Sequence, residues 1–462
     1  MATFSIKQIL QATESSISKK GNKELCTSIS IDSRKIDPDS LFIAIKGENF
    51  DGHDFTKIAC DQGAIAVLVA NENVNINLDT TIILTKSNTL KSLQELAKYH
   101  RLRYNIPVVS ITGSNGKTTT KDIVTGLLKE KFNVLKTLGN QNNEIGLPLT
   151  LLNITEKHDI VVTEFGMRGR GQIQELAEIA IPNFAIITNV GNTHIELLGS
   201  KENIALAKSE LVEFIDEPGT VFLNADDEFV KKMADKTKAK VVFFGITSSN
   251  VSFKAENIIY NTQTLHTSFE VKTKSETFSI NMPLFGIHNV YNALAAISLA
   301  KELNLDNKEI QQGFINISLG KMRQEVIKKG LFTIINDAYN ASPVSMKAAL
   351  ETLSMLPAAR KIAVLGDMLE LGEYSLEAHK EIGDFISEKD IDFLVTVGPH
   401  AKNIALQAQK SRLENIYTST NHEEAKEILT KIIKPQDAIL FKGSRGMQME
   451  KIIDIIDFES IK

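Results

Sequence analysis

Short runs of apolar residues, each bounded by turn residues, recur through the first hundred positions and predict buried strands. These runs cover residues 40–47, 64–70 and 81–85. Residues 89–104 instead place apolar side chains at helical spacing, and Asn105-Ile106-Pro107 ends that pattern. We therefore expect a small mixed α/β domain over residues 1–104, with a domain boundary directly after it.

Beyond this boundary, strand patterns alternate with helical patterns, which is typical of βαβ units around a parallel sheet. The expected strands cover residues 108–112, 159–166, 184–190, 220–227 and 241–245. The expected helices cover residues 119–132, 172–180 and 288–303. Between residues 251 and 283, apolar and polar residues alternate, which predicts an antiparallel hairpin. We assign residues 105–318 to this central domain.

A second α/β series begins near Leu331. Its expected strands cover residues 331–337, 360–367, 392–398 and 437–443, and a helical stretch follows each of them. No Gly-x-Gly-x-x-Gly sequence occurs, so a dinucleotide-binding site is not indicated. The expected fold class is α/β with three domains. The last of them, over residues 319–462, is expected to be Rossmann-like.

Composition narrows the class of protein further. The 462 residues exceed what one ordinary core holds, and 42% hydrophobic with 24% charged residues is normal for a soluble globular protein. A net charge of −5 gives no support to a nucleic-acid partner. Cys26 and Cys60 lie in no metal-ligand spacing, so reduced structural thiols are expected. Without a signal-like segment or a bilayer-spanning apolar stretch, we expect a cytoplasmic enzyme with no membrane insertion.

The most informative stretch is VVSITGSNGKTTTKDIV, residues 108–124. It has the strand, turn and helix of a phosphate-binding loop, but Ile111 stands where the usual pattern has another glycine. Gly113 and Gly116 would let the backbone approach a phosphate, and the helix that follows would direct free N–H groups at it. Lys117 could reach the β- and γ-phosphates, and the Thr118 hydroxyl could bind Mg²⁺. The central domain is therefore expected to be a P-loop-type ATPase domain with an antiparallel insert. The alternative is an ordinary glycine turn.

Two side chains near other strand ends could join this site. Glu164 ends an apolar strand pattern, and His194 lies in TNVGNTHIE, which leaves the end of the next predicted strand. Ligands of open α/β sheets bind beyond the carboxyl ends of the strands, so a carboxylate and an imidazole there are suitable metal ligands. A solvated strand-end carboxylate and an ordinary loop histidine are the alternatives.

Long motifs throughout the chain resemble the Mur ligases. They are TGSNGKTT, TLGNQNNEIGLPLTLL, TEFGMRGRGQI, TNVGNTHIE, LFGIHNVYNALAA, DAYNASPVSM and LGDMLELGE, with IDSRKIDPDSLFIAIKGENFDGHDF near the N-terminus. The resemblance covers nearly the whole chain. Members of this family use the shorter Gly-x-x-Gly-Lys-Thr loop, which would explain why Ile111 is not a glycine. Within the family, the sequence most resembles the ligases that add D-alanyl-D-alanine to UDP-N-acetylmuramoyl-tripeptide.

The resemblance implies ATP-dependent amide formation in peptidoglycan precursor synthesis. The tripeptide carboxylate would attack the γ-phosphate of ATP to give an acyl phosphate, and the amine of D-alanyl-D-alanine would then attack its carbonyl carbon and release phosphate. ATP and Mg²⁺ are the implied cofactors, the two peptide compounds are the implied small-molecule substrates, and a monomer is expected. Phosphoryl transfer needs positioning and charge neutralisation more than a protein nucleophile, and the sequence offers no evident nucleophile.

The resemblance also assigns roles to individual residues. The catalytic residues would be Lys117, Glu164, His194 and Lys208. The nucleotide would be bound by Gly113, Ser114, Asn115, Gly116, Lys117, Thr118 and Thr119 in the loop, and by Asn289, Asn292, Arg323 and Asp337 elsewhere. Thr118 and Glu164 would bind one Mg²⁺, and His194 and a carbamylated Lys208 would serve a second. A buried lysine has a lowered pKa, so its neutral amine can react with CO₂. Surface positions are the alternative for Lys208 and for the two asparagines.

Substrate contacts follow from the same resemblance. Asn142 and Asn143 would lie near the muramoyl peptide, Ser33 and Arg34 near the uridine, and Tyr339, Asn340 and Ser342 near the dipeptide. For Ser33 and Arg34, a capped turn on a solvated face is the alternative. Ser342 stands where the commoner motif of the family has asparagine, which weakens an amide contact there. The Asp-Asn-Pro-Arg signature of the diaminopimelate-adding relatives is absent.

Other functions stay open on the sequence. The chain could add another amino acid to a UDP-muramoyl peptide, or it could act as a folylpolyglutamate-synthetase-like ligase. A different class is a P-loop kinase or nucleotide switch protein with no ligation step. Only a ligase should need both the acid substrate and the amine for steady ATP turnover.

Overall fold

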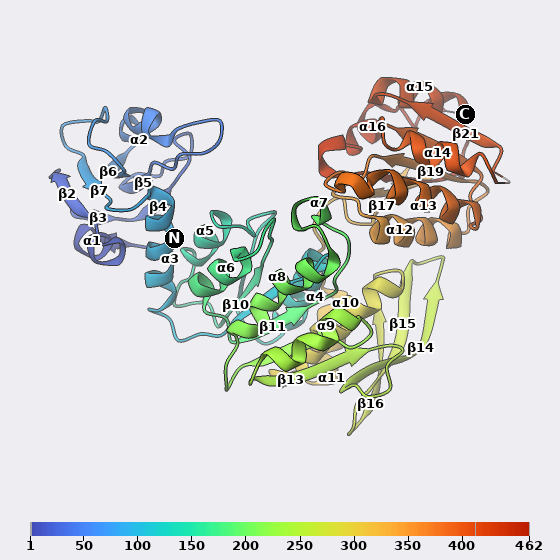
Figure 1. Ribbon diagram of the computed structural model, residues 1–462, viewed down its shortest axis with the longest axis horizontal. Coiled ribbons are helices and arrows are strands. Elements are labelled where there is room, and N and C mark those ends of the chain that lie inside the picture. The colour runs from blue at the N-terminus through green and yellow to red at the C-terminus, as the bar shows by residue number, and fades with distance from the viewer. Residues whose placement is uncertain (1, 412, 462) are drawn as a thin grey trace. The chain divides into compact units, whose positions relative to one another are not determined.

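The predicted apolar runs form buried strands in a computed structural model that describes residues 2–411 and 413–461 (Figure 1). Strands β6 (Ala64–Val69) and β8 (Val108–Thr112) have every residue buried. Such strands lack polar alternation because both of their faces are covered. The chain divides into two units. The first comprises Met1–Ser110, Phe132–Met167 and Gly171–Ala185, and the second comprises Ile111–Lys131, Arg168–Arg170 and Ile186–Lys462.

The first unit contains a five-stranded sheet in the order β2-β7-β6-β5-β4. Its other strands are β2 (Ser16–Lys19), β4 (Ser28–Ser30), β5 (Ser40–Ile43) and β7 (Thr81–Leu84). All pairs are parallel except β2 with β7. The three strands expected from the sequence are confirmed as β5, β6 and β7. Strands β2 and β4 were not predicted, and neither were β1 (Phe4–Ser5), β3 (Leu25–Cys26), α1 (Ile6–Thr13), α2 (Thr56–Asp61) and the 3₁₀ helix η1 (Gly52–Phe55).

Helix α3 (Thr89–Arg101) begins where predicted and ends before residue 104. The Asn88 side chain caps its first turn by accepting a hydrogen bond from the backbone N–H of Lys91. At the other end, the buried Arg101 guanidinium donates to the carbonyl oxygens of Ala180 at 3.1 Å and Tyr104 at 2.8 Å. A buried guanidinium must find such partners, and the bond to Tyr104 accompanies a turn that closes the helix early.

The first unit contains further elements beyond α3. They are β9 (Val134–Lys136), β10 (Ile160–Glu164), α5 (Gly146–Leu151) and α6 (Gln172–Ala180). Strands β9 and β10 pair in parallel. Helix α3 contacts both α5 and α6, and the Gln94 side chain on α3 donates to Glu175 on α6 at 2.7 Å. The predicted strand 159–166 and helix 172–180 are thus confirmed.

The middle of the second unit continues the βαβ pattern. Its helices are α4 (Lys117–Leu128), α7 (Ile195–Leu198), α8 (Lys201–Phe214), α9 (Glu228–Lys232), α10 (Ile287–Glu302) and α11 (Asn307–Ile315), with the 3₁₀ helix η2 (Met233–Lys236). Strand β11 (Phe184–Ile187) reaches from the first unit into this one, and β12 (Thr220–Asn224) and β13 (Lys240–Gly245) are parallel. The predicted hairpin is a three-stranded antiparallel meander of β14 (Phe253–Asn261), β15 (His266–Lys272) and β16 (Thr277–Met282).

The C-terminal part of the second unit is a six-stranded sheet in the order β17-β18-β22-β19-β20-β21. The strands are β17 (Glu325–Lys329), β18 (Phe332–Asp337), β19 (Lys361–Gly366), β20 (Phe393–Val397), β21 (Asn415–Ser419) and β22 (Ala438–Lys442). Only β17 runs antiparallel to its neighbour. Its helices are α12 (Pro343–Met355), α13 (Ser375–Ser387), α14 (Lys402–Ala408), α15 (His422–Ile432) and α16 (Glu450–Ile455), with the 3₁₀ helices η3 (Gly372–Tyr374) and η4 (Arg445–Met447).

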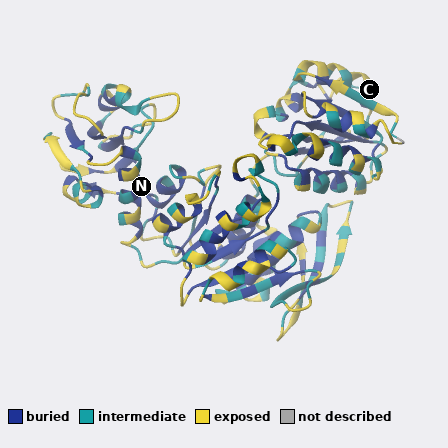
Figure 2. Cartoon of the chain, viewed as in Figure 1, coloured by how far each residue is buried: buried dark blue, intermediate teal, exposed yellow. Residues whose placement is uncertain are grey.

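Alternate residues of this sheet belong to two cores. Figure 2 shows the strands of the sheet largely buried. On β19, Leu365 packs with the apolar residues of α12, α13 and α14, whereas its neighbour Val364 packs with those of α15 and α16. This alternation is the period of a strand with helices on both faces. The predicted Rossmann-like α/β arrangement is confirmed.

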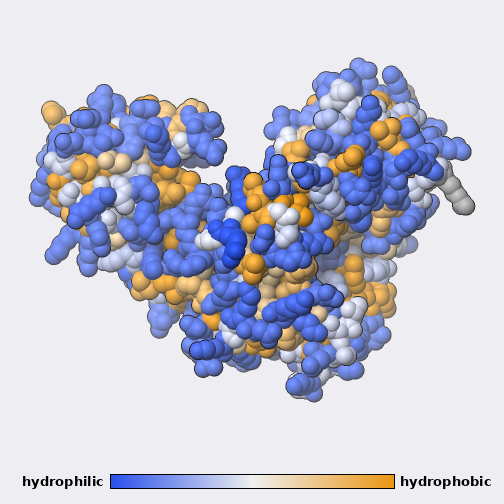
Figure 3. Space-filling model, in the orientation of Figure 1, coloured by the Kyte–Doolittle hydropathy of each residue, from blue (hydrophilic) through white to orange (hydrophobic). Residues whose placement is uncertain are grey.

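The molecular surface is mainly hydrophilic on the face drawn in Figure 3, with hydrophobic side chains between the polar ones. Across residues 2–411 and 413–461, no helix is long and apolar enough to cross a membrane.

Helix α13 carries a buried histidine, His379, that holds the loop after β19. Its Nε2 accepts a hydrogen bond from the Met368 N–H at 3.0 Å, and its Nδ1 lies 2.6 Å from the carbonyl oxygen of Ser375. A ring that makes both bonds carries its proton on Nδ1 alone, so the imidazole is neutral. Burial lowers the pKa of His379, because the charged ring would lose its contact with solvent.

We expect the free energy of unfolding to fall as the pH drops from about 7 to about 5. The unfolded histidine takes up its proton first, since the pKa of His379 is lower in the folded state. The neutral His379 therefore contributes to the free energy of unfolding above the pKa of the unfolded histidine. This contribution is lost as the pH falls below that pKa. Urea unfolding at several pH values measures this dependence. It should be weaker in His379→Gln than in a control variant, His266→Gln, and equal slopes would contradict the assignment.

Candidate functional site

The predicted phosphate loop lies between the buried strand β8 and helix α4. Gly113 has a φ of +151° and Gly116 a φ of +80°, conformations that side chains rarely adopt. A Cβ atom at Gly113 would lie 1.9 Å from Thr188 Oγ1, and one at Gly116 would lie 2.4 Å from Asn292 Oδ1. No side chain caps the N-terminal end of α4. That end is thus suited to bind an anion.

Residues that follow β11 hold this loop in place. The Asn115 N–H donates to Asn189 Oδ1 at 2.9 Å, and Thr188 Oγ1 donates to the Asn115 carbonyl oxygen at 2.7 Å. The Gly191 N–H donates to Ser114 Oγ at 2.8 Å. The sequence TNVG therefore braces the loop backbone, a role that the sequence analysis did not predict for it.

Lys117 bends back over the loop. Its Nζ donates to the carbonyl oxygens of Gly113 at 2.9 Å and Ser114 at 3.3 Å. The ammonium thus lies beside the backbone that would surround a phosphate. Thr118, the next residue, is buried at the start of α4, and Thr119 is half-buried. These positions agree with the predicted phosphate-binding role, which no bound ligand tests.

Lys208 is buried on α8, with 2% of its surface exposed. Burial, together with the nearby positive charge of Lys117, holds the pKa of Lys208 well below that of a free lysine. Among the described residues, no carboxylate lies within ion-pair distance of its amine. The alternative of a surface lysine is wrong, and a neutral amine is the form that such surroundings favour.

His194 lies at the start of α7 with a left-handed backbone φ of +62°. Its Nδ1 lies 2.8 Å from a carboxylate oxygen of Glu370, and this contact lowers the pKa of Glu370. The predicted metal ligand therefore has a protein partner, from the loop before η3. No group of three or more His, Cys, Asp or Glu side chains among residues 2–411 and 413–461 is arranged to hold a metal ion. A role in metal binding stays a prediction.

In the first unit, Glu164 ends β10 with 3% of its surface exposed. The Asn142 side-chain amide donates to Glu164 Oε1 at 2.8 Å. The structure thus brings together two of the predicted site residues, and a solvated strand-end carboxylate is ruled out. Asn143 instead uses its side chain to accept the Gly146 N–H at 2.9 Å, at the start of α5.

Ser33 and Arg34 lie in a turn after β4. The Arg34 guanidinium donates to both carboxylate oxygens of Asp32, at 2.8 and 2.9 Å, and remains largely exposed. Hydrogen bonds from Arg34 lower the pKa of Asp32 to about 2. This is the solvated turn that the sequence analysis gave as the alternative, and a uridine contact stays a prediction.

Asn289 and Asn292 are buried on α10, so they are not helix-surface amides. Asn292 Oδ1 accepts a hydrogen bond from Thr120 Oγ1 at 3.2 Å, on the helix that follows the phosphate loop. Asn289 Nδ2 donates to Gln324 Oε1 at 3.1 Å. The two amides thus lie between the loop and the start of the C-terminal sheet, where their contact with adenine remains a prediction.

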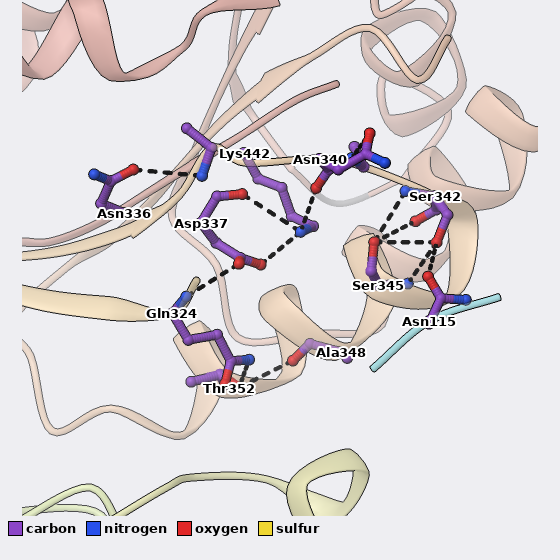
Figure 4. A network of polar contacts seen from close by, with 12 residues as sticks. Asn115, Gln324, Asn336, Asp337, Asn340, Ser342, Ser345, Ala348, Thr352 and Lys442 are labelled. Carbon is purple, nitrogen blue, oxygen red and sulfur yellow. Dashed lines mark hydrogen bonds and ion pairs between the residues drawn. The ribbon is translucent and has the colours of Figure 1, made fainter. Parts of the chain in front are cut away.

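Asp337, at the end of β18, lies at the centre of a polar network (Figure 4). Its Oδ1 accepts the Gln324 N–H at 3.0 Å, and its Oδ2 accepts a hydrogen bond from Lys442 at 2.5 Å. Nearby, the Arg323 guanidinium lies 3.8 Å from the centre of the Tyr339 ring. This stacking brings a predicted nucleotide contact and a predicted dipeptide contact together.

Ser342 connects the C-terminal sheet to the phosphate loop. Its hydroxyl donates to Asn115 Oδ1 at 2.8 Å and accepts the Ser345 N–H at 3.3 Å, which caps α12. This contact between Ser342 and the loop was not predicted from the sequence, and neither were roles for Gln324 and Lys442. For Lys442 a signal existed, since a charged residue after four apolar strand residues was the pattern that drew attention to Glu164.

The fold and this site define an α/β nucleotide-binding protein with a glycine-rich phosphate loop. Comparisons with known proteins give the family. Family models match the Mur ligase catalytic domain over residues 26–110, the Mur ligase middle domain over residues 111–300, and the Mur ligase glutamate ligase domain over residues 322–445. The chain belongs to the Mur ligase family and is an ATP-dependent ligase.

Individual relatives are similar over almost their whole length. The UDP-N-acetylmuramoyl-tripeptide–D-alanyl-D-alanine ligase of Bacillus subtilis is 40% identical over 437 residues, 93% of each chain. Among solved structures, MurF from Acinetobacter baumannii has a TM-score of 0.91 and 29% identity over 98% of each chain. MurF from Thermotoga maritima, solved with ADP, has a TM-score of 0.82 and 30% identity over 93% of this chain and 96% of its own. This likeness confirms the predicted three-domain fold.

A methyl group at residue 116 should weaken nucleotide binding. Gly116→Ala would place a side chain at a left-handed φ and in overlap with Asn292. The control position is Gly171, directly before α6, which has a φ of +81° but nothing within 4 Å of an added Cβ atom. Gly171→Ala therefore carries only the backbone strain, about 1 kcal/mol. We expect about tenfold weaker binding of an ATP analogue for Gly116→Ala, measured by calorimetry, and a change below about twofold for the control. Equal affinities in the two variants would contradict this account of the loop.

Proposed function

We propose that this ligase joins D-alanyl-D-alanine to UDP-N-acetylmuramoyl-tripeptide and releases UDP-N-acetylmuramoyl-pentapeptide, ADP and phosphate. The observation that carries the proposal is the likeness to the Bacillus subtilis ligase of that name, at 40% identity over 93% of both chains. The match covers 93% of the chain, so it includes most of both terminal domains, where substrate-binding residues would differ between ligases of different specificity.

Each of the three domains would bind one of the three substrates. Residues 1–104 would bind the UDP-muramoyl substrate, residues 105–318 would bind ATP, and residues 319–462 would bind the incoming dipeptide. We further propose that the enzyme acts as a monomer in the cytoplasm, where nucleotide-linked precursors and ATP are both present.

In the proposed reaction, the loop around Gly113 holds the phosphates of ATP. Lys117 would exchange its carbonyl partners for oxygens of the β- and γ-phosphates, since charge builds up there as the tripeptide carboxylate attacks. The backbone N–H groups at the start of α4 would bind the same oxygens. The carboxylate oxygen forms a bond to the γ-phosphorus, ADP leaves, and the dipeptide amine then displaces phosphate from the acyl carbon.

Mg²⁺ would neutralise phosphate charge at this site when bound. Carboxylate and hydroxyl oxygens are the ligands that it prefers. Thr118 and Glu164 supply such oxygens, and Lys208 would supply them once carbamylated. The observation that supports the last assignment is the buried amine of Lys208, which has no carboxylate within ion-pair distance among the described residues. His194, after leaving Glu370, would serve a second Mg²⁺ together with the carbamylated Lys208.

The remaining predicted contacts are proposals of the same kind. Asn289, Asn292, Arg323 and Asp337 would bind the nucleoside of ATP, and Tyr339, Asn340 and Ser342 would bind the dipeptide. Asn142, Asn143, Ser33 and Arg34 would contact the nucleotide-linked peptide. Their burial and hydrogen bonds support these roles to different degrees. Asn142, held against Glu164, is better supported than the exposed Arg34.

Because the chain belongs to the Mur ligase family, the alternatives of a P-loop kinase and of a nucleotide switch protein are excluded. A ligase for another amino acid or for folylpolyglutamate remains an outcome of the assay that follows.

Phosphate release across a panel of amines tests the proposed specificity. We expect steady release with ATP, UDP-N-acetylmuramoyl-tripeptide and D-alanyl-D-alanine together, and only background release when either peptide compound is left out. Single amino acids, and L-alanyl-L-alanine as the matched dipeptide, should support little turnover, because the site would be shaped for the D-dipeptide. Faster release with a single amino acid, or with a folate substrate, would assign the enzyme to another step.

Lys208→Ala should remove most of the activity, and short-chain carboxylates such as acetate or propionate should restore part of it. The added acid would supply in the vacated space the oxygens that the carbamate provides. Lys201→Ala, on the exposed face of the same helix, is the matched control and should retain its rate.

Carbamylation itself has a direct readout. Protein equilibrated with ¹³C-bicarbonate should show a carbamate carbon resonance that the Lys208→Ala variant lacks. A bare amine at Lys208 in high-resolution density of a fully liganded, metal-bound complex would reject the assignment.

A further inference from the structure

A buried lysine at the end of β22 joins two segments of the C-terminal sheet. Lys442 has 2% of its side chain exposed, and its strand lies between β18 and β19. Its Nζ donates to Asp337 Oδ2 at 2.5 Å and to the carbonyl oxygen of Asn340 at 3.0 Å, and it reaches the Asp337 carbonyl oxygen at 3.5 Å (Figure 4). An ammonium has three N–H donors, so its partners within residues 337–340 occupy all of them.

The partner carboxylate is more accessible than the lysine. Asp337 has 14% of its side chain exposed, and its Oδ1 is held by the backbone N–H of Gln324. The carboxylate is therefore the more accessible partner of the pair, and it lies at the carboxyl end of a parallel strand. Ligands of such sheets bind at this end.

The same lysine holds the segment that reaches the phosphate loop. Asn340, whose carbonyl oxygen Lys442 binds, precedes Ser342 by two residues. Ser342 caps α12 and donates to Asn115 in the loop. One ammonium thus sets the spacing between the outward carboxylate at residue 337 and the loop contact at residue 342.

The sheet offers a lysine with similar partners at its other end. Lys361 begins β19, and its Nζ donates to Asp390 and to the Ser354 carbonyl oxygen, both at 2.6 Å. Its partner Asp390 is 82% exposed. A carboxylate and a carbonyl oxygen therefore satisfy a lysine at both ends of the sheet, but only Lys442 lies among residues that meet the phosphate loop.

We propose that Lys442 is a positioning residue of the ligase, one that fixes the Asp337 carboxylate for the nucleotide and holds residues 337–342 in the geometry that contacts the phosphate loop. Lys442 itself does not touch the ligand, because it is buried and its donors are occupied. The proposal rests on the proposed function only in taking Asp337 as a nucleotide contact.

A double-mutant cycle tests the proposal through nucleotide affinity. Lys442→Met should raise the dissociation constant of a non-hydrolysable ATP analogue about tenfold, as loss of one charge-assisted hydrogen bond would. In an Asp337→Asn background, the same change should cause a clearly smaller loss of affinity than in the parent, because the part of the effect that passes through the carboxylate is already absent. Calorimetry with Mg²⁺ and the analogue alone needs neither peptide substrate, so a wrong substrate assignment leaves this test intact.

Lys361→Met is the matched control for the loss of a buried lysine. It should lower the melting temperature but leave the analogue affinity unchanged. An affinity of Lys442→Met within about twofold of the parent, an equal loss in the Asp337→Asn background, or an equal loss in Lys361→Met would each overturn the proposal. If Lys442→Met does not fold, Lys442→Arg keeps the charge with a displaced head group and enters the same comparisons.

Discussion

The geometry of the phosphate loop depends on two residues that lack a side chain. Thr188 fills the space beside Gly113, and Asn292 fills the space beside Gly116, so no Cβ atom fits at either position. The absence of both side chains lets these protein groups pack tightly against the loop backbone. The segment after β11, helix α10 and the C-terminal sheet all reach this loop. Its geometry is therefore fixed by elements from across the second unit, and not by its own four residues alone.

Positive charge is the second constraint on the site. Lys117 and Lys208 lie close enough for the charge of one to lower the pKa of the other, and Lys208 is too deeply buried for water to screen it. Without phosphates, Lys117 uses loop carbonyl oxygens as partners. A neutral or carbamylated Lys208 relieves the repulsion, whereas a second ammonium would increase it. Both the neutral amine and the proposed carbamate are therefore compatible with a buried position beside Lys117.

Sequence patterns predicted the parts of the fold whose residues are uniformly buried. The runs that became β6, β8 and β19 could be identified because parallel strands covered on both faces are continuously apolar. Strands β17 and β21 were not predicted, because they lie at the two edges of their sheet, where exposed polar residues interrupt the run of apolar residues. Of the site, the loop, Glu164 and Lys208 could be proposed from motifs. The Asn189 brace and the Lys442 network could not, since they depend on which loops meet in three dimensions.

Ser342 shows how a departure from the family's usual residue can be tolerated. Asparagine and serine are both good caps for the start of a helix, so either would hold the first turn of α12. The serine hydroxyl accepts the Ser345 N–H and still has its own proton, which it donates to Asn115. An asparagine side chain divides these tasks between its carbonyl oxygen and its NH₂ group. The substitution therefore keeps one acceptor for the helix and one donor for the phosphate loop, and both connections survive the loss of the amide.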